Sequence, residues 1–381
     1  MWSPANRAHT DIDYCCRTEA LQTRVGNATA GHDPPQPVPP VVLVRFFHRI
    51  GQDPAPDSAL ISRGFRPGWG WFGRGPWGSS ADVALGQTDR VDPVIIEVAL
   101  NGATRRSIQP HVPVSPAEIA ASGRLCVEAG ATIVHQHDDF SAMAQSPKGA
   151  GPAGMAAAGL AAYAGLLPHH PEVLVYPTAN FRGPTIEDRW DHHRVLAREM
   201  PAQGLGPLRM GLVDPGTVTL GSYVYGYSPA EIGYKWAACR ELGLGASVAC
   251  FTPAYAEAVR AEHSERGLPP GSLVKFYLSD GFGLPPTEAS LDHYLGIVAG
   301  TGLPWAVAVL GGDVVGSGLA AAAIERGGHV RVGLEDFASA SGRTPRNEEL
   351  VAEVAELARR SGRGVATCAD TASILGTPPL P

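Results

Sequence analysis

Residues 133–139 read Ile-Val-His-Gln-His-Asp-Asp, an apolar run that ends in two histidines one residue apart. Successive side chains of a β-strand point to opposite faces, so His135 and His137 would project on the same side. A second run, Gly327 to Asp336 (GGHVRVGLED), also predicts a strand and ends in two adjacent carboxylates. We therefore expect the two strand ends to meet with a metal ion between them.

Strand and helix patterns alternate on both sides of these two runs. Apolar runs predict strands at 94–100, 132–137, 173–176, 210–213, 246–251, 273–278, 305–310 and 329–334. Helical patterns follow each of them: Ser115 and Glu118 form a capping-box pattern, Ser228 precedes a proline, and Asn347 is expected to cap the last helix. Eight strands that each precede a helix are typical of an α/β protein with a (β/α)8 TIM barrel. An open doubly wound sheet is the alternative, but no GxGxxG turn follows the first strand.

A barrel fixes where the polar strand ends lie. Active-site groups of such barrels sit at the carboxyl ends of the strands. His137, Thr178, Asp214 and Glu335 fall at such ends. The eighth strand would neighbour the first and lie one strand away from the second, so the two halves of the metal site would share one rim.

Composition excludes several classes of function. The 381 residues carry a formal charge of -7, which gives no electrostatic reason to bind nucleic acid or an anionic membrane. The six cysteines form no CxxC pair, which is typical of reduced thiols in a cytoplasmic protein. The sequence has no pattern of a secretory signal and no run of about 18 apolar residues that would span a membrane.

The first part of the chain differs from the rest. Pairs such as Pro34-Pro35 and the segment 68–71 (GWGW) lie among scattered charges without a sustained period. We expect 1–92 to be a low-order extension and 93–381 to be a (β/α)8 catalytic barrel. A start codon placed too far upstream would explain the extension equally well, and a tryptophan-rich segment that binds a partner is a further alternative.

The strongest candidate site combines His135, His137 and Glu335. Two imidazoles and one carboxylate form a three-ligand set with an open position, as in catalytic zinc sites. Asp138 and Asp139 could orient a histidine ring from outside the metal. The alternatives are two histidines that pack locally and an acidic loop that faces solvent.

Arg331 and Asp336 form a second group beside the first. Arg331 precedes Glu335 by four residues on the same strand face, and Asp336 follows it directly. Asp336 could be a general base whose pKa Arg331 depresses, or Arg331 could hold a substrate carboxylate. A structural ion pair is the alternative. His329 shares this face lower in the barrel, where we expect a buried, hydrogen-bonded histidine.

Several motifs resemble the β-keto acid cleavage enzyme family. They are VALNG at 98–102, QPHVPVSPAEI at 109–119, EAGATIVHQH at 128–137, GGHVRVGLED at 327–336, NEELV at 347–351 and VAT at 365–367. The resemblance covers about 93–376. It implies a zinc-dependent barrel, commonly a homo-oligomer, that uses acetyl-CoA as co-substrate.

The resemblance also implies roles for individual residues. His135, His137 and Glu335 would hold the metal, and Asp336 would be the base set by Arg331. Substrate contacts would fall to Thr178 and Thr217, with Asn180 a further candidate in the loop of Thr178. A 3-keto acid would chelate the metal, form a stabilised enolate, attack acetyl-CoA, and split by a retro-Claisen step into acetoacetate and a new acyl-CoA.

The sequence departs from the family pattern at three places. The segment 102–106 (GATRR) lacks a glutamate that reads a substrate amino group, so an amino-keto acid is not expected. Arg105 or Arg106 could instead meet an anionic or polar tail, or face solvent. The fifth strand reads Ser247-Val248-Ala249 without an acid, and Gly312 stands where the family carries an arginine. The last two of these changes leave open a different acyl acceptor, altered coenzyme A binding or reduced activity.

Two other functions fit the same residues. A metal-dependent hydrolase or aldolase would use the three ligands without coenzyme A. An amidohydrolase normally carries histidines on strands five and six, whereas ASVACF and LVKFYL contain none. A degenerate barrel that binds a ligand without turnover is the second alternative.

Overall fold

The structure is a computed structural model, which describes residues 92–138, 151–180, 183–338 and 342–378. The expected extension, apart from Asp92, and the candidate Asp139 lie outside these residues. The barrel belongs to one compact unit of the chain.

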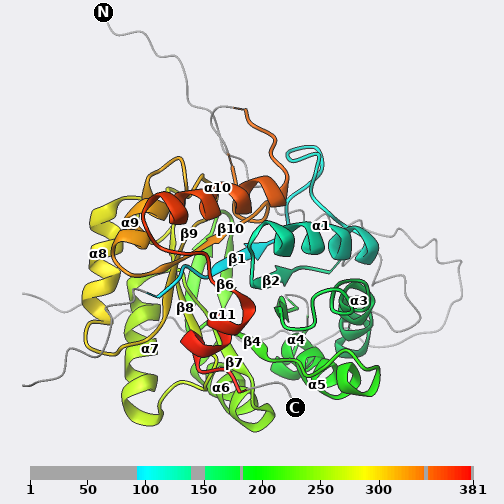
Figure 1. The fold of residues 1–381 in the computed structure, drawn as a ribbon. Coiled ribbons are helices and arrows are strands. Elements are labelled where there is room, and N and C mark those ends of the chain that lie inside the picture. Colours follow the sequence, from blue (N-terminus) through cyan, green and yellow to red (C-terminus); the bar gives the residue numbers. More distant parts are fainter. Residues whose placement is uncertain (1–91, 139–150, 181–182, 339–341, 379–381) are drawn as a thin grey trace, which may run out of the picture. The chain divides into compact units, whose positions relative to one another are not determined.

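Eight parallel strands form one sheet in the order β3-β2-β1-β10-β9-β8-β7-β4 (Figure 1). Their bounds are Ile96–Ala99 for β1, Ile133–Gln136 for β2, Leu174–Pro177 for β3, Met210–Val213 for β4, Gly245–Cys250 for β7, Leu273–Leu278 for β8, Trp305–Val309 for β9 and His329–Val332 for β10. The two end strands, β3 and β4, lie beside each other. The sheet therefore closes almost completely, and the predicted (β/α)8 barrel is confirmed.

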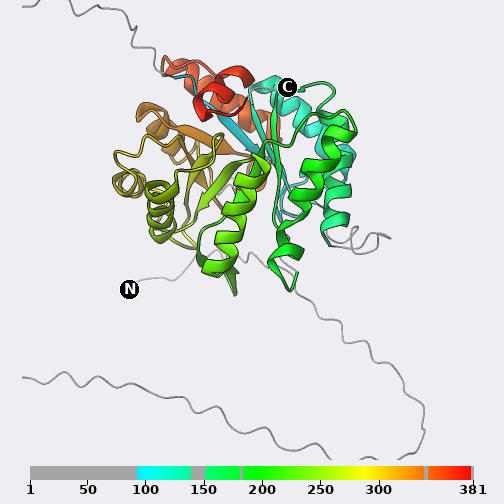
Figure 2. The same cartoon turned by 90° about the horizontal axis from the view of Figure 1, so that it is seen from below.

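Helices cover the outside of the strands (Figure 2). They are α1 Pro116–Ala129, α3 Pro152–Leu166, α4 Ile186–Trp190, α5 His192–Ala202, α6 Pro229–Leu242, α7 Pro253–Arg266, α8 Glu288–Ile297, α9 Leu319–Glu325, α10 Asn347–Arg360 and α11 Cys368–Leu375. The predicted caps are confirmed at two of them, where Ser115 and Ser228 form capping boxes with Glu118 and Glu231. None of the described helices is long and apolar enough to cross a membrane.

The strand register brings the two predicted halves of the site together. β1 pairs with β10 on one side, with Glu97 opposite Arg331, and with β2 on the other, with Ala99 opposite His135. The predicted neighbourhood of the first, second and eighth strands is therefore confirmed. His329 is buried, and its Nδ1 accepts a hydrogen bond from the backbone of Ile95 at 3.1 Å, as expected for a structural histidine.

Four local features differ from the sequence-based expectations. The segment 214–222, for which the sequence suggests a loop, contains β5 (Thr217–Leu220), and β6 (Tyr223–Gly226) follows it to complete an antiparallel hairpin. The helix expected over 184–200 is divided into α4 and α5, and α11 was not expected. Asn347 is not the cap of α10, because Arg346 holds that position. The Asn347 side chain instead forms hydrogen bonds with the main chain of Leu334 and of Leu100.

Candidate active site

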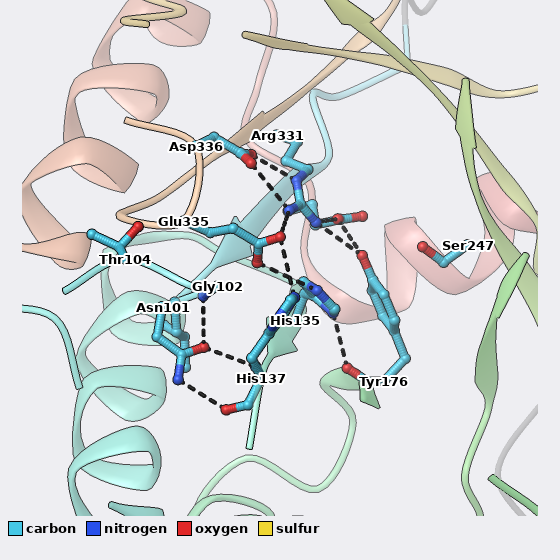
Figure 3. Close-up of polar contacts among 12 residues, drawn as sticks. Asn101, Gly102, Thr104, His135, His137, Tyr176, Ser247, Arg331, Glu335 and Asp336 are labelled. Atoms are coloured by element: carbon cyan, nitrogen blue, oxygen red, sulfur yellow. Dashed lines mark hydrogen bonds and ion pairs between the residues drawn. The ribbon is translucent and has the colours of Figure 1, made fainter. Parts of the chain in front are cut away.

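The two histidines and the glutamate converge at the carboxyl ends of β2 and β10 (Figure 3). The Nε2 atom of His135 lies 3.4 Å from Oε2 of Glu335, and Nε2 of His137 lies 3.4 Å from Oε1. The potential ligand atoms of the three residues all fall within 4.8 Å of one another. In a tetrahedral centre with bonds of about 2.1 Å, two ligand atoms are about 3.4 Å apart. The arrangement fits a single metal ion.

The ring of His135 is oriented for metal binding. Its Nδ1 lies 3.2 Å from the carbonyl oxygen of Tyr176, which can only accept, so Nδ1 carries the proton and Nε2 presents its lone pair to Glu335. The ring also stacks on that of Tyr176 at 4.4 Å. Burial lowers the pKa of His135 well below its ordinary value, although Glu335 acts in the opposite direction. A neutral imidazole is the form that binds a metal.

Glu335 supplies an observation that favours a cation at this place. Its Oε2 is buried and has no hydrogen-bond partner among the described residues. Burial alone would raise the pKa of Glu335, but His137 and Arg331 lower it well below its usual value, so the carboxylate is charged. A buried charged oxygen without a partner is costly unless an ion or ligand meets it. The residues present therefore fit a divalent metal.

Asn101 fixes the main chain that carries His137. Its Oδ1 accepts from the backbone N–H of His137 at 2.8 Å, and its Nδ2 donates to the carbonyl of the same residue at 2.9 Å. The next residue, Gly102, has φ +53°, and a Cβ there would lie 2.4 Å from Cγ of Glu335. Asn101 thus fixes the metal-ligand candidate His137, and Gly102 leaves room for the side chain of the candidate Glu335.

Asn347 performs a similar task on the other side of Glu335. Its Oδ1 accepts from the backbone N–H of Leu334 at 2.8 Å, and its Nδ2 donates to the carbonyl of Leu100 at 2.8 Å. The hydroxyl of Thr104 donates to the carbonyl of Leu334 at 2.8 Å. These bonds tie the end of β10 to the end of β1, so the separation between the ligand strands is fixed by side chains as well as by the sheet.

Arg331 lies behind Glu335 and is almost completely buried. Its Nε and Nη2 donate to the two carboxylate oxygens of Asp336 at 2.7 and 3.3 Å, and Nη2 also lies 3.0 Å from Glu335. Burial raises the pKa of Asp336 to about 6, although Arg331 lowers it. The expected ion pair between Arg331 and Asp336 is present. The pKa of Asp336 is nevertheless raised and not depressed, because the effect of burial outweighs that of Arg331.

A buried polar network fills the barrel below the metal ligands. The Oε1 atom of Glu97 lies 2.8 Å from Arg331 and 3.0 Å from Lys275, and it accepts from the Tyr176 hydroxyl at 2.5 Å. Lys275 also donates to Tyr176 and to Ser247 at 2.6 and 2.5 Å. Burial would raise the pKa of Glu97, but Lys275 and Arg331 lower it to about 2. Two cations and one carboxylate therefore share the floor of the site.

A cavity opens above this network. Residues at the carboxyl ends of all eight barrel strands and in the hairpin line it: Ala103, His135, His137, Thr178, Leu212, Asp214, Leu220, Tyr223, Tyr225, Ala249, Phe251, Lys275, Tyr277, Leu310, Arg331 and Glu335. Asp336 is outside this lining, whereas Arg331, which donates to its carboxylate, is part of it. The cavity lies at the barrel face where the fold places active sites.

The three substrate-binding candidates Thr178, Asn180 and Thr217 occupy different positions relative to the cavity. Thr178 is buried, lines the cavity, and its carbonyl accepts from His192 at 2.7 Å. Asn180 is buried in the same loop, and its Nδ2 donates to the carbonyl of Asp188 at 3.4 Å, outside the cavity lining. Thr217 is exposed on β5, while its hairpin neighbours contribute to the lining.

The two arginines of the first loop do not join the cavity lining. Arg105 and Arg106 are both exposed. Arg106 forms an ion pair with Glu118 at 2.5 Å, and its side chain is 52% exposed. Glu118 is also the capping-box residue of α1, so this arginine belongs to the helix start rather than to the cavity.

Four features of the site are not among those predicted from the sequence: Glu97, Lys275, Asn101 and the contribution of the hairpin to the cavity. A signal for the first two was present, since each is the only charged residue in an otherwise apolar run, VIIEVAL and LVKFYL. A charge in the middle of a buried strand needs a partner, and the barrel interior is where one can be found.

Comparison with known proteins identifies the family of the chain. The profile of the beta-keto acid cleavage enzyme family matches residues 93–377. A 3-oxoadipate:acetyl-CoA acetyltransferase of Cupriavidus necator is 26% identical over 300 residues, which make up 76% of this chain and 96% of that protein.

Solved structures show a likeness of fold. The apo structure of ObcA superposes with a TM-score of 0.55 at 16% identity, covering 70% of this chain and 66% of that one. The ternary complex of ObcA with C4-CoA adduct and oxalate gives a TM-score of 0.51 at 16% identity, covering 70% and 68%. The chain thus spans about two thirds of the length of ObcA, and the likeness concerns the barrel alone.

Proposed function

The chain belongs to the β-keto acid cleavage enzyme family, and from this premise we propose that it converts a 3-keto acid and acetyl-CoA into acetoacetate and a new acyl-CoA at a zinc centre. The metal ligands are His135, His137 and Glu335. The observation that carries the proposal is the unpartnered buried oxygen of Glu335, which faces the two imidazoles at the wall of a cavity. Nitrogen and oxygen ligands with an open position suit zinc in a catalytic site.

The metal, when bound, supplies Lewis-acid polarisation of the substrate ketone and carboxylate. The protein residues orient the reactants and move the proton. Thr178 is the proposed contact to the substrate, because its side chain lines the cavity beside the ligands. Asp336 is the proposed base, and it would release one of its hydrogen bonds from Arg331 to take a proton from C2 of the 3-keto acid.

The overall change balances without any further reactant. Removal of the C2 proton gives an enolate, which forms a bond from C2 to the acetyl carbonyl carbon and displaces coenzyme A as its thiolate. The thiolate adds to the original C3 carbonyl, and the bond between C2 and C3 breaks. C2 leaves with the electron pair, regains a proton and becomes part of acetoacetate, while C3 becomes the carbonyl of the new thioester.

Two measurements test the proposal. Metal analysis of purified protein should find about one zinc per chain. Acetoacetate incubated with isotopically labelled acetyl-CoA should exchange the label, because with a methyl tail the products are chemically identical to the reactants. No exchange in protein that retains its zinc would overturn the proposed reaction.

The same assay separates the alternative functions. A hydrolase or aldolase that does not use coenzyme A would consume a 3-keto acid equally well when acetyl-CoA is omitted. A barrel that only binds its ligand would leave both compounds unchanged. Slower exchange of the C2 hydrogen for deuterium in an Asp336→Asn variant that keeps its zinc would support Asp336 as the base.

A further inference from the structure

The far wall of the cavity, opposite the metal ligands, is apolar. Ala249, Tyr277 and Ala308 form a small buried cluster at the carboxyl ends of β7, β8 and β9, against which Phe251, Phe282 and Leu310 pack. Phe251 and Phe282 also pack against the main hydrophobic core and so join the two. We name these six residues the apolar wall. Four of its members, Ala249, Phe251, Tyr277 and Leu310, line the same cavity as the metal ligands.

Phe251 is the centre of the apolar wall. Its ring lies 4.7 Å from that of Tyr277 and 5.6 Å from that of Phe282, measured between centroids. On its other side it meets Tyr225 of the hairpin at 6.0 Å. These contacts hold the ring in one place, so the wall is a preformed surface rather than a set of loose side chains.

Such a surface is unusual at this position of a barrel. Inward-facing residues at the carboxyl ends of barrel strands commonly supply polar groups for binding and catalysis. Here the outermost inward-facing positions of three adjacent strands are apolar or aromatic, whereas Lys275 lies one inward-facing position deeper on β8 and joins the polar groups of β1, β3 and β10. An apolar lining with few polar groups is typical of a pocket that binds the apolar part of a ligand.

The charges of the cavity lead to the same conclusion. Among the described lining residues the basic side chains other than the histidines are Lys275 and Arg331, and both already contact Glu97. Asp214, which accepts from the Tyr225 hydroxyl, adds a negative charge to the lining. A second carboxylate on the substrate would therefore lose water without gaining a free cation, which is strongly unfavourable.

We propose that the preferred substrate is a 3-keto acid with an uncharged, apolar tail that packs on the apolar wall. The assignment rests on the proposed function and adds the substrate class to it. It also separates this chain from its relative, which is named for 3-oxoadipate, a compound with a carboxylate at the end of its tail.

The test compares two six-carbon substrates with the full-length zinc enzyme and acetyl-CoA. 3-Oxohexanoate would give butanoyl-CoA, and 3-oxoadipate would give succinyl-CoA, both measured by mass spectrometry. We expect kcat/KM to favour 3-oxohexanoate by at least about 100-fold. From acetoacetate through 3-oxopentanoate to 3-oxohexanoate, it should rise about four-fold per methylene group. Equal or better use of 3-oxoadipate would overturn the assignment.

Two variants of Leu310 give an internal comparison. Leu310 is partly exposed, so a long polar side chain can be placed there. Leu310→Arg should raise the ratio of 3-oxoadipate to 3-oxohexanoate use at least 10-fold, whereas Leu310→Gln, which adds polarity without charge, should raise it much less. An unchanged ratio in Leu310→Arg would contradict a tail that lies on this wall.

The acetoacetate exchange assay distinguishes a failure of the tail assignment from a failure of the proposed function. Exchange together with a preference for the dicarboxylate would leave the proposed function standing and overturn the tail assignment. If the zinc-loaded enzyme showed no exchange, the proposed function would fail, and the tail assignment would fail with it.

Discussion

The two sides of the cavity are built by different physical means. On the side of β1, β2 and β10, hydrogen bonds from buried charged groups and asparagine side chains hold the residues around the metal ligands in place. On the side of β7, β8 and β9, apolar rings and aliphatic groups pack against one another. Hydrogen bonds fix atoms in direction as well as distance, whereas apolar packing tolerates changes in ligand shape. The polar side is therefore suited to the chemistry and the apolar side to recognition of the tail.

Lys275 connects the two sides. It belongs to β8, the central strand of the apolar side, but its ammonium group reaches Glu97 on β1 and Tyr176 on β3. The strand residues next to it, Val274 and Phe276, are buried and apolar. One inward-pointing residue on β8 thus belongs to the polar network, and the next inward-pointing one, Tyr277, belongs to the apolar wall.

The largest effect is expected when the metal-ligand candidate Glu335 on the polar side is replaced. Glu335→Gln keeps the shape of the side chain but removes the charge that faces both imidazoles. Zinc content should fall from about one per chain to near zero, and label exchange should fall by more than about 1000-fold, because Lewis-acid stabilisation is worth several kcal/mol. Glu118→Gln, at the exposed start of α1, is the matched control and should keep the metal. A Glu335→Gln protein with full zinc content would refute the ligand assignment.

A second prediction concerns Lys275, which connects the two sides of the cavity. Lys275→Met leaves Glu97 buried with one cation fewer, so the free energy of unfolding should fall by about 3 to 5 kcal/mol. Arg266→Met removes an exposed arginine that pairs with Glu262 and should cost no more than about 1 kcal/mol. Chemical denaturation at neutral pH measures both. A loss for Lys275→Met no larger than that of the control would mean that the network contributes little.

The sequence predicted the polar side better than the apolar side. His135, His137, Arg331, Glu335 and Asp336 stand close together in two short runs, and strand alternation decides which of them share a face. The barrel then brings the runs together, since its strand order follows from the alternation of strands and helices. These residues were therefore identifiable before the structure.

The apolar wall could not be identified in the same way. Ala249, Tyr277 and Leu310 have the composition of any buried strand, and an apolar residue carries no mark of whether it faces the core or a cavity. The hairpin differs in this respect, because the runs TVTL and YVYG on either side of Gly221-Ser222 are a recognisable two-residue hairpin pattern. The expectation of a loop over 214–222 does not make use of this pattern. Gly221 has φ +58°, as such a turn requires.

The third prediction concerns Asn101, which holds the main chain of the metal-ligand candidate His137. Asn101→Leu abolishes both hydrogen bonds to the main chain of His137 while keeping a side chain of similar size. Zinc affinity, measured by competition with a chelator, should fall about 10- to 100-fold, as is usual when a group that orients a ligand is lost. Asn180→Leu, another buried asparagine but away from the ligand strands, should leave the affinity unchanged. An equal loss in both variants would indicate general destabilisation instead.

The smallest effect is expected at Arg106, which the sequence offered as a contact for an anionic tail. The structure pairs its guanidinium with Glu118 at the exposed start of α1, outside the lining of the cavity. Arg106→Ala should therefore change kcat/KM for 3-oxohexanoate and 3-oxoadipate by less than about two-fold, and the free energy of unfolding by no more than about 1 kcal/mol. A selective loss of 3-oxoadipate turnover would place this arginine beside the tail, and would show that recognition is not confined to the apolar wall. Measuring both substrates in one mixture makes the comparison independent of the concentration of active enzyme.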